Sequence, residues 1–206
     1  MKLLVATRST HKVAEIRAIL AGVPDLELLD LDAAGIPEDP AEDALEPYDT
    51  FEANARSKAA YFRKVSGLVT VSDDSGIEVD ALGGQPGVRS RRFAPLPEST
   101  PRAVQDRANN EHLLARLAGL EPERRTGRYV CVAALAELDG PEVLFRGTAE
   151  GRVLEAARGT GGFGYDPLFH ATDLGSTFGE AEPRAKDAVS HRGKAFRALA
   201  AYLLSR

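Results

Sequence analysis

The chain has 206 residues, of which 43% are hydrophobic and 28% charged, a composition typical of a globular protein large enough for one sizeable core. The formal net charge of −5 disfavours a general nucleic-acid binder, and no apolar run approaches the roughly 20 residues that a membrane span needs. A single cysteine, Cys131, excludes an intramolecular disulfide; with a start too short for a secretory signal, it favours the cytoplasm.

The first half of the chain predicts short strands alternating with helices. Strands are expected where apolar runs are short, and helices where apolar residues recur every three or four positions. The predicted elements are a strand over 2–6, a helix over 12–20, an acidic loop over 32–49, a helix from the N-cap Thr50 to about Lys64, and strands over 68–72 and 77–82.

The second half predicts the same alternation with one long hairpin. The predicted elements are a helix over 99–119 capped by Thr100, strands over 128–138 and 142–155 joined at Asp139-Gly140, a glycine-rich loop, and a last helix over 194–204. Strands interleaved with helices predict an α/β fold with a mixed sheet. No flexible linker interrupts the chain, so residues 1–206 are expected to form a single domain with two lobes.

The first stretch that could carry chemistry is ATRSTHKVAE, where the first strand passes into a helix. Backbone N–H groups and the positive end of a helix dipole attract anions, and Arg8 and Lys12 add charge. It is not a Walker motif. The stretch by itself favours a solvated turn with Ser9 or Thr10 as the helix cap over a phosphate site.

The second stretch is LVTVSDDSGIEVD, with Asp73 and Asp74 side by side. Asp, Ser and Gly favour turns, so these residues are expected to form the tight turn of a β-hairpin. A magnesium ion would relieve the repulsion between two carboxylates, and one of them could take a proton from water. Turn and metal site both remain open from these residues alone.

Two further stretches lie near the end of the chain. RGTGGFGYDPLF places Phe163 and Tyr165 among glycines, which allow close backbone approach while an aromatic ring stacks on a flat base. KDAVSHRGKAF gathers basic side chains that suit phosphate or carbonyl oxygens, of which Lys186 and Arg192 are two. An ordinary loop and a solvated helix start are the alternatives.

Taken together, these stretches describe a nucleotide-phosphate site, and the chain resembles the inosine triphosphate pyrophosphatase family. The resemblance covers nearly the whole chain. It rests on ordered motifs at family-like spacing, which are LVATRSTHKVAEI, TFEANARSKA, SDDSGIEVDALGGQPGV, GTGGFGYDPLF and SHRGKA. It implies a homodimer whose long mixed sheet, flanked by helices, carries two lobes around a central cleft. It also implies Mg²⁺-dependent hydrolysis of the noncanonical purine nucleoside triphosphates ITP, dITP and XTP to the monophosphate and pyrophosphate.

The resemblance also implies the roles of individual residues. Asp74 is the expected catalytic base and a metal ligand, with Glu46 as the second metal ligand. The expected substrate-binding residues are Thr7, Arg8, Ser9, Thr10, His11, Lys12, Ser75, Phe163, Gly164, Tyr165, Asp166, Lys186, His191 and Arg192. Arg192 offers only donors, so we expect it to favour the 6-oxygen of hypoxanthine or xanthine over the amino group of adenine.

The chain departs from the family pattern at a few positions. Ser9 replaces the usual Asn, Ala53 replaces the Glu that completes a capping box with Thr50, and Arg89 and Arg91 add charge. Two alternatives therefore stay open, a nucleotide-binding module with decayed catalysis and a pyrophosphatase for modified pyrimidine nucleotides. No membrane or nucleic-acid partner is expected.

Overall fold

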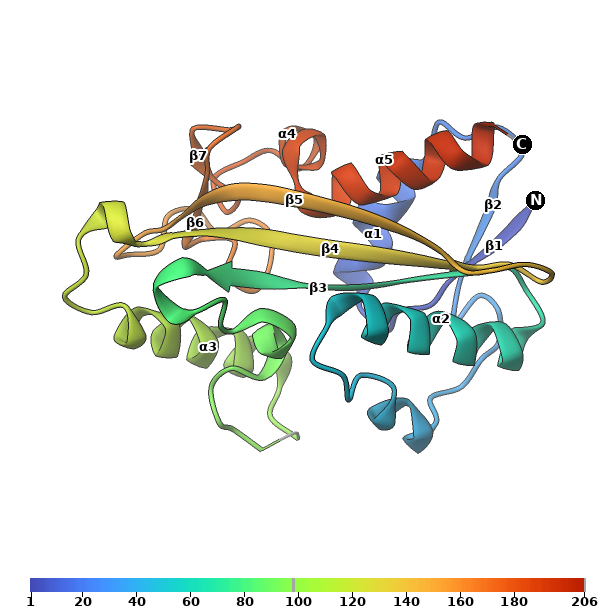
Figure 1. Cartoon of the computed structure of the whole chain (residues 1–206), viewed down its shortest axis with the longest axis horizontal. Helices are drawn as coiled ribbons and strands as arrows, with labels where there is room; N and C mark the ends of the chain where they lie inside the picture. Colours follow the sequence, from blue (N-terminus) through green and yellow to red (C-terminus); the bar gives the residue numbers. More distant parts are fainter. Residues whose placement is uncertain (98, 206) are drawn as a thin grey trace. The chain divides into compact units, whose positions relative to one another are not determined.

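The computed structural model describes residues 1–97 and 99–205 and has an α/β fold with a mixed sheet (Figure 1). The strands are β1 Lys2–Val5, β2 Glu27–Asp30, β3 Thr70–Val79, β4 Thr126–Ala136, β5 Val143–Val153, β6 Phe169–Ala171 and β7 Ser176–Thr177. The α-helices are α1 Thr10–Leu20, α2 Phe51–Ser66, α3 Arg102–Arg116, α4 Pro183–Val189 and α5 His191–Leu204. The strand order over the described residues is β2-β1-β3-β4-β5-β6-β7, with β1 parallel to β2 and β3, and β6 antiparallel to β5 and β7. The predicted fold class is confirmed.

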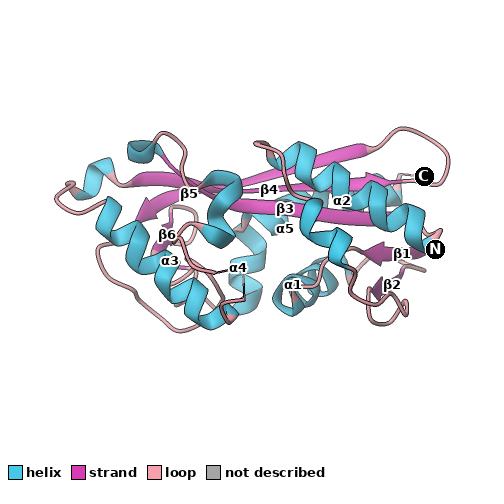
Figure 2. Ribbon diagram, turned by 90° about the horizontal axis from the view of Figure 1, so that it is seen from below, coloured by secondary structure: helices cyan, strands magenta, loops and turns pink. Residues whose placement is uncertain are grey.

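The chain divides into two compact units. The first comprises residues 1–74, 131–147 and the chain from 192 onward, and the second comprises 75–130 and 148–191. The long strands β3, β4 and β5, drawn in magenta in Figure 2, contribute residues to both units. The expectation of a single domain with two lobes stays a prediction.

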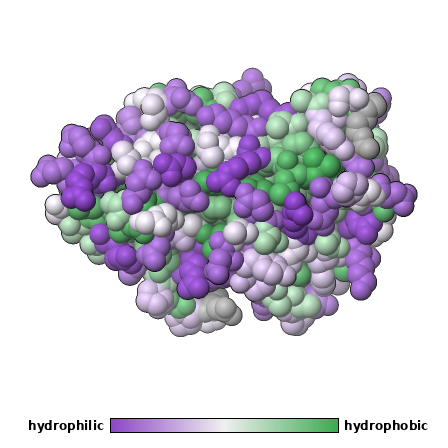
Figure 3. All heavy atoms as spheres, in the orientation of Figure 1, coloured by the Kyte–Doolittle hydropathy of each residue, from purple (hydrophilic) through white to green (hydrophobic). Residues whose placement is uncertain are grey.

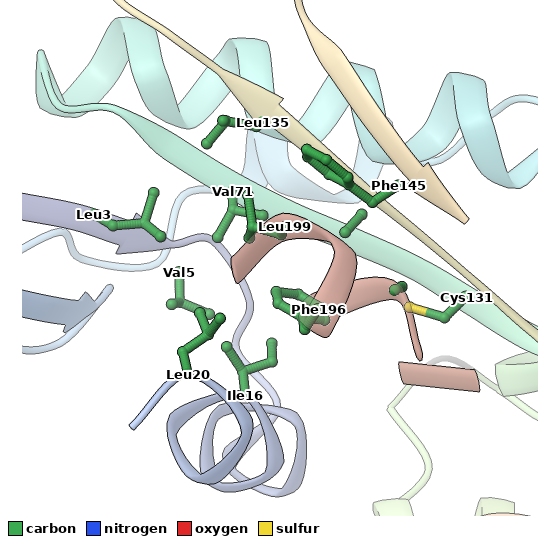
Figure 4. Close-up of a cluster of buried hydrophobic side chains, with 12 residues drawn as sticks. Leu3, Val5, Ile16, Leu20, Val71, Cys131, Leu135, Phe145, Phe196 and Leu199 are labelled. Carbon is green, nitrogen blue, oxygen red and sulfur yellow. The ribbon is translucent and has the colours of Figure 1, made fainter. Parts of the chain in front are cut away.

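In the first unit, helices cover both faces of the sheet. Successive side chains of a strand point to opposite faces, so neighbouring residues of β1 enter different clusters. Leu3 and Val5 pack in one buried cluster with residues of α1 and α5 (Figure 4), whereas Leu4 packs in another with Phe62 of α2. Full burial of each such side chain contributes about 1.5–3 kcal/mol to folding, which fixes β1 between the two layers.

The second unit has its own core, built from α3, the sheet and several aromatic rings. Leu113 of α3 belongs to the same buried cluster as Ile77 of β3. Phe169 packs against Tyr129 and Phe178, with ring centroids 4.8 and 5.3 Å apart. Aromatic pairs at such distances add to the energy of area burial, so this cluster gives the second unit a rigid base.

The predicted hairpin at the two aspartates is wrong, because residues 70–79 form the single strand β3. Ser72, Asp73 and Asp74 lie within the strand and are only 2%, 1% and 6% exposed. Local chemistry favours a turn here, but each of these side chains has a hydrogen-bond partner on a helix, which lets the strand continue. Gly76 does not form a turn but allows another backbone segment to approach closely, since a Cβ there would lie 2.4 Å from the backbone oxygen of Gly87.

The other predicted elements match the structure closely. Helix α2 starts after its cap Thr50 as predicted, and α3 starts after Pro101, one residue later than the predicted cap. The strands β4 and β5 flank the predicted Asp139-Gly140 turn. Sequence reasoning missed β2, β6, β7 and α4, which are too short to show a clear periodicity.

The described part of the chain contains no helix that is long and apolar enough to cross a membrane. Figure 3 shows hydrophilic residues over much of the face that it draws, with smaller hydrophobic areas between them. Exposed large hydrophobic side chains come from separate parts of the sequence, such as Tyr48, Val65 and Leu138. Exposed apolar side chains are by themselves normal on a protein surface.

Candidate active site

The loop between β1 and α1 contains the segment predicted to bind phosphate. Ser9 has an extended backbone and caps α1, because its Oγ accepts a hydrogen bond from the backbone N–H of Lys12 at 3.4 Å. The hydroxyl of Thr7 accepts a hydrogen bond from the backbone N–H of Ser9 at 3.2 Å, while Thr10 and His11 are exposed. The helix N-terminus that favours anions is therefore present, with Ser9 as its N-cap.

Arg8 lies in the same loop, but its guanidinium contacts the acidic loop of the first unit. It donates to Glu42 at 2.6 Å, to the backbone oxygen of Ile36 at 2.9 Å and to that of Pro37 at 2.8 Å. The hydrogen bond to Glu42 raises the pKa of Arg8 and outweighs the effect of burial. Arg8 thus anchors the loop, and its predicted phosphate contact stays a prediction.

Asp73 is the centre of a buried charge cluster in the first unit. Its Oδ2 lies 3.1 Å from Nζ of Lys12 and accepts hydrogen bonds from Arg192 at 3.1 and 3.3 Å. Arg192 also donates to Glu15 at 2.5 Å, so all of its nitrogen atoms contact carboxylates. Burial alone raises the pKa of Asp73, but the charges of Lys12, Arg192 and Lys58 together hold it well below its usual value.

Asp74 points to the other face of the sheet from Asp73 and contacts α2, because successive side chains alternate along β3. Its Oδ2 accepts a hydrogen bond from Nδ2 of Asn54 on α2 at 2.9 Å. Burial raises the pKa of Asp74, so it holds a proton more readily than Asp73. Since Asp73 contacts α1 and α5 whereas Asp74 contacts α2, the expectation that one turn presents both carboxylates to one metal ion is wrong.

Glu46 lies near Asp74 in the first unit. Its negative charge raises the pKa of Asp74, and its carboxylate accepts a short hydrogen bond from Lys58. Lys58 also donates to the backbone oxygen of Asp73 at 2.6 Å. The described residues contain no cluster of three or more His, Cys, Asp or Glu side chains that could hold a metal. Mg²⁺, however, commonly binds one or two carboxylates together with substrate phosphates, so Glu46 and Asp74 fit that ion.

In the second unit, the glycine-aromatic loop is organised around Asp166. Its Oδ2 accepts hydrogen bonds from Nζ of Lys186 and from the backbone N–H of Phe163, both at 2.8 Å. The Nζ of Lys186 also lies 5.1 Å from the ring centroid of Phe163. Gly162 has φ 71°, and a Cβ there would meet Asp166 Oδ2 at 2.1 Å. The glycine is therefore required for the loop to close on its carboxylate.

The same loop is tied to other parts of the second unit by Tyr165 and Gly164. The hydroxyl of Tyr165 donates to the backbone oxygen of Ser90 at 2.9 Å, and burial raises the pKa of this phenol. The backbone oxygen of Gly164 accepts a hydrogen bond from Asn110 at 3.0 Å. Ser75 lies half-buried on β3. Tyr165 is thus a packed residue, and Phe163 is the more exposed aromatic ring of the loop.

The remaining candidates are buried. In the second unit, the ring of His191 stacks on Tyr129 with centroids 4.5 Å apart and an interplanar angle of 9°. In the first unit, Cys131 lies in β4 with 0% exposure, and burial raises the pKa of its thiol. The interpretation of Cys131 as a core residue is confirmed.

Sequence reasoning missed three side chains that contact the predicted site residues. They are Glu15, Asn54 and Lys58. A signal for the latter two exists, because both fall within the stripe of α2 that also buries Ala55 and Ala59. A polar residue inside a buried apolar stripe needs a partner, and here the partners lie on β3.

The chain matches the sequence model of the Ham1 family over residues 3–202. It is 46% identical, over 194 residues, to a dITP/XTP pyrophosphatase of Symbiobacterium thermophilum, covering 94% of this chain and 90% of that protein. Among solved structures, a HAM1 protein from Coxiella burnetii has a TM-score of 0.84 at 30% identity, covering 100% of both chains. A nucleoside-triphosphatase / dITP/XTP pyrophosphatase from Mycobacterium abscessus has a TM-score of 0.72 at 40% identity, covering 98% of this chain and 99% of that one.

Proposed function

The chain belongs to the Ham1 family, and we infer that it is an enzyme that hydrolyses the purine nucleoside triphosphates dITP, ITP and XTP to the monophosphate and pyrophosphate. Relatives with the name dITP/XTP pyrophosphatase are 46% and 43% identical over 94% and 98% of the chain. The resemblance to the inosine triphosphate pyrophosphatase family is thereby confirmed.

One observation from the geometry carries this function. In the first unit, the cations Lys12, Lys58 and Arg192 surround Asp73, while Asp74 on the same strand has a raised pKa. A group of cations suits a triphosphate, and a buried carboxylate on the same strand suits general base catalysis. The part of β3 that carries Asp73 and Asp74 therefore supports both phosphate binding and general base catalysis.

We propose the following division of work among these residues. Asp74 orients a water molecule and accepts its proton as the water attacks the α-phosphorus. The backbone N–H groups at the start of α1 and the ammonium of Lys12 bind phosphate oxygens. Asp73 stays ionised and holds Lys12 and Arg192 in place, so that the positive charge faces a fixed position.

We further propose Mg²⁺ as the cofactor, held by Glu46 and Asp74. The ion supplies charge neutralisation for the triphosphate and for the leaving pyrophosphate. Burial is the main cause that raises the pKa of Asp74, and the negative charge of Glu46 raises it further, which supports a cation at these two carboxylates. Addition of EDTA is expected to abolish turnover, and Mg²⁺ in excess is expected to restore it.

Recognition of the base is proposed for the glycine-aromatic loop. Phe163 offers a ring for stacking, and Gly164, Tyr165 and Asp166 shape the loop around it. The Asp166–Lys186 ion pair supports this role, because its buried geometry fixes the backbone of the loop. The expectation that Arg192 selects a 6-oxygen stays a prediction, since in this structure its nitrogen atoms contact Asp73 and Glu15.

Assembly and location also remain proposals. We propose a homodimer in the cytoplasm that binds no nucleic acid. The single buried cysteine supports a location in the cytoplasm, and the net charge of −5 supports the absence of nucleic-acid binding. Light scattering at several protein concentrations is expected to give twice the mass of one chain.

A panel of nucleotides tests the proposed activity. Pyrophosphate release with Mg²⁺ is measured on ITP, dITP, XTP, GTP, ATP and dUTP. ITP, dITP and XTP are expected to be better substrates than ATP, because a buried donor that faces their 6-oxygen would face the amino group of adenine at a cost of about 1–3 kcal/mol. Highest activity on dUTP, or tight ITP binding without turnover, would contradict the proposal.

A further inference from the structure

Helix α2 presents two polar side chains one turn apart, Asn54 and Lys58, to the same pair of segments. Residues at positions i and i+4 lie on one face of a helix. Asn54 contacts Tyr48 and Asp74, whereas Lys58 contacts Glu46 and the backbone of Asp73. Each side chain therefore connects the segment 46–48 to β3.

The amide of Asn54 has its orientation dictated by these contacts. Its Oδ1 accepts a hydrogen bond from the backbone N–H of Tyr48 at 3.0 Å, so its NH₂ group must occupy the other side. That group donates to the backbone oxygen of Tyr48 at 3.1 Å and to Oδ2 of Asp74 at 2.9 Å. A flipped amide would place oxygen against two oxygens. Both N–H groups of the amide therefore donate hydrogen bonds, and one of them faces Oδ2 of Asp74.

The segment that carries Glu46 depends on this amide. Tyr48 itself is 49% exposed. Asn54, by contrast, is only 1% exposed and binds both the N–H and the oxygen of Tyr48. The amide therefore fixes the backbone two residues after Glu46 and, at the same time, one oxygen of Asp74.

We propose that Asn54 is a positioning residue that sets the arrangement of Asp74 relative to Glu46. It touches neither water nor phosphate in the reaction but acts through Asp74. The inference rests on the proposed function, in which these two carboxylates serve as base and metal ligands. A buried amide with both N–H groups hydrogen-bonded is suited to this task, because it presents a fixed donor to one oxygen of the carboxylate.

The substitutions Asn54→Asp and Asn54→Ala test the proposal. Asn54→Asp keeps an acceptor for the N–H of Tyr48 but loses the donor to Asp74, whereas Asn54→Ala loses all three bonds. Loss of a group that orients a ligand typically reduces activity or metal affinity by about 10- to 100-fold. We expect kcat for ITP to fall by this factor in both variants, with KM changed by less than about threefold.

Ser72→Ala provides a matched control. Ser72 is 2% exposed, and its Oγ donates to the backbone oxygen of Ala55 at 2.7 Å, so it joins the same strand to the same helix without touching Asp74. We expect this variant to lose thermal stability but to keep the kcat of the wild-type protein. Circular dichroism verifies that each variant is folded.

A second readout needs no turnover. The increase in Tm on addition of Mg²⁺ alone is expected to be smaller in Asn54→Asp than in the wild-type protein and in Ser72→Ala. Equal kcat values and equal Mg²⁺ shifts for the Asn54 and Ser72 variants would overturn the positioning role while leaving an active wild-type enzyme. A wild-type protein that releases no pyrophosphate would instead overturn the proposed function.

Discussion

Asp73 and Asp74 are identical residues next to each other, yet their surroundings give them opposite acid–base behaviour. Burial raises the pKa of both, but the charges of Lys12 and Arg192 reverse the effect for Asp73. Asp74 receives a hydrogen bond from Asn54, which is neutral and compensates only in part. The alternation of a single strand, rather than any difference in chemistry, therefore separates an electrostatic anchor from a proposed base.

The role of Asp74 is tested by Asp74→Asn. We expect kcat for ITP to fall by at least about 100-fold, because an amide cannot accept the proton of the attacking water. The affinity for ITP, measured by calorimetry with the inactive variant, is expected to stay within a few-fold. Asp43→Asn, a change at an exposed residue, serves as the control. Turnover of Asp74→Asn at the wild-type rate would remove Asp74 from the base role.

The ionisation of Asp73 predicts a pH dependence of stability. Its folded pKa lies below the unfolded value of about 3.9, so the unfolded chain binds more protons between the two values. The stabilisation is therefore fully present above about pH 5 and is lost as the pH falls below the unfolded pKa. Below the unfolded pKa, we expect the difference in unfolding free energy between the wild-type protein and Asp73→Asn to shrink by up to about 1.4 kcal/mol per pH unit.

Urea unfolding at a series of pH values checks this prediction. Other carboxylates titrate in both proteins and cancel in the difference, which isolates Asp73. A difference that stays constant from about pH 6 to about pH 3 would show that the pKa of Asp73 is not lowered on folding.

At the scale of elements, the local sequence decides the structure of the glycine-aromatic loop and the start of α2. The loop closes on Asp166 only because Gly162 has no side chain and a positive φ. Helix α2 begins at its predicted cap, where Oγ of Thr50 accepts a hydrogen bond from the N–H of Ala53 at 3.2 Å. Both features follow from the residues at the position itself.

Gly162→Ala is expected to destabilise the second unit strongly. The new Cβ would overlap Asp166 and displace it from Lys186, and breaking a buried ion pair costs about 3–5 kcal/mol. Gly175→Ala is the matched control, because Gly175 has nearly the same φ of 70° but nothing within 4 Å of a Cβ. The control is expected to cost only about 1–2 kcal/mol. Equal losses in chemical denaturation would contradict the overlap.

Ala53→Glu is expected to stabilise α2 by about 0.5 kcal/mol. The new carboxylate stands at the third helical position and can accept from the backbone N–H of Thr50, completing a capping box. Ala60→Glu, at an exposed position in the middle of the same helix, is the control. The same gain for both variants would assign the effect to charge instead of capping.

For the whole molecule, the continuity of the long strands suggests cooperative behaviour. The strands β3, β4 and β5 each contribute residues to both units. Loss of either unit would interrupt all three strands, which supports the expectation of a single domain. The units are therefore expected to unfold together.

Differential scanning calorimetry tests this expectation. We expect one transition whose calorimetric and van't Hoff enthalpies agree. Two separate transitions, or a proteolytic fragment of the first unit that stays folded, would contradict it.

The sequence by itself determined the α/β class, the long elements and the family, because these depend on periodicity, caps and ordered motifs that are local along the chain. It also indicated the residues of the candidate site. Only the tertiary structure decided that Asp73 and Asp74 lie in a strand instead of a turn, and that Arg8 contacts Glu42. Local chemistry favours a turn at the two aspartates, but partners such as Arg192, 119 residues away from Asp73 along the chain, make the burial of these carboxylates possible.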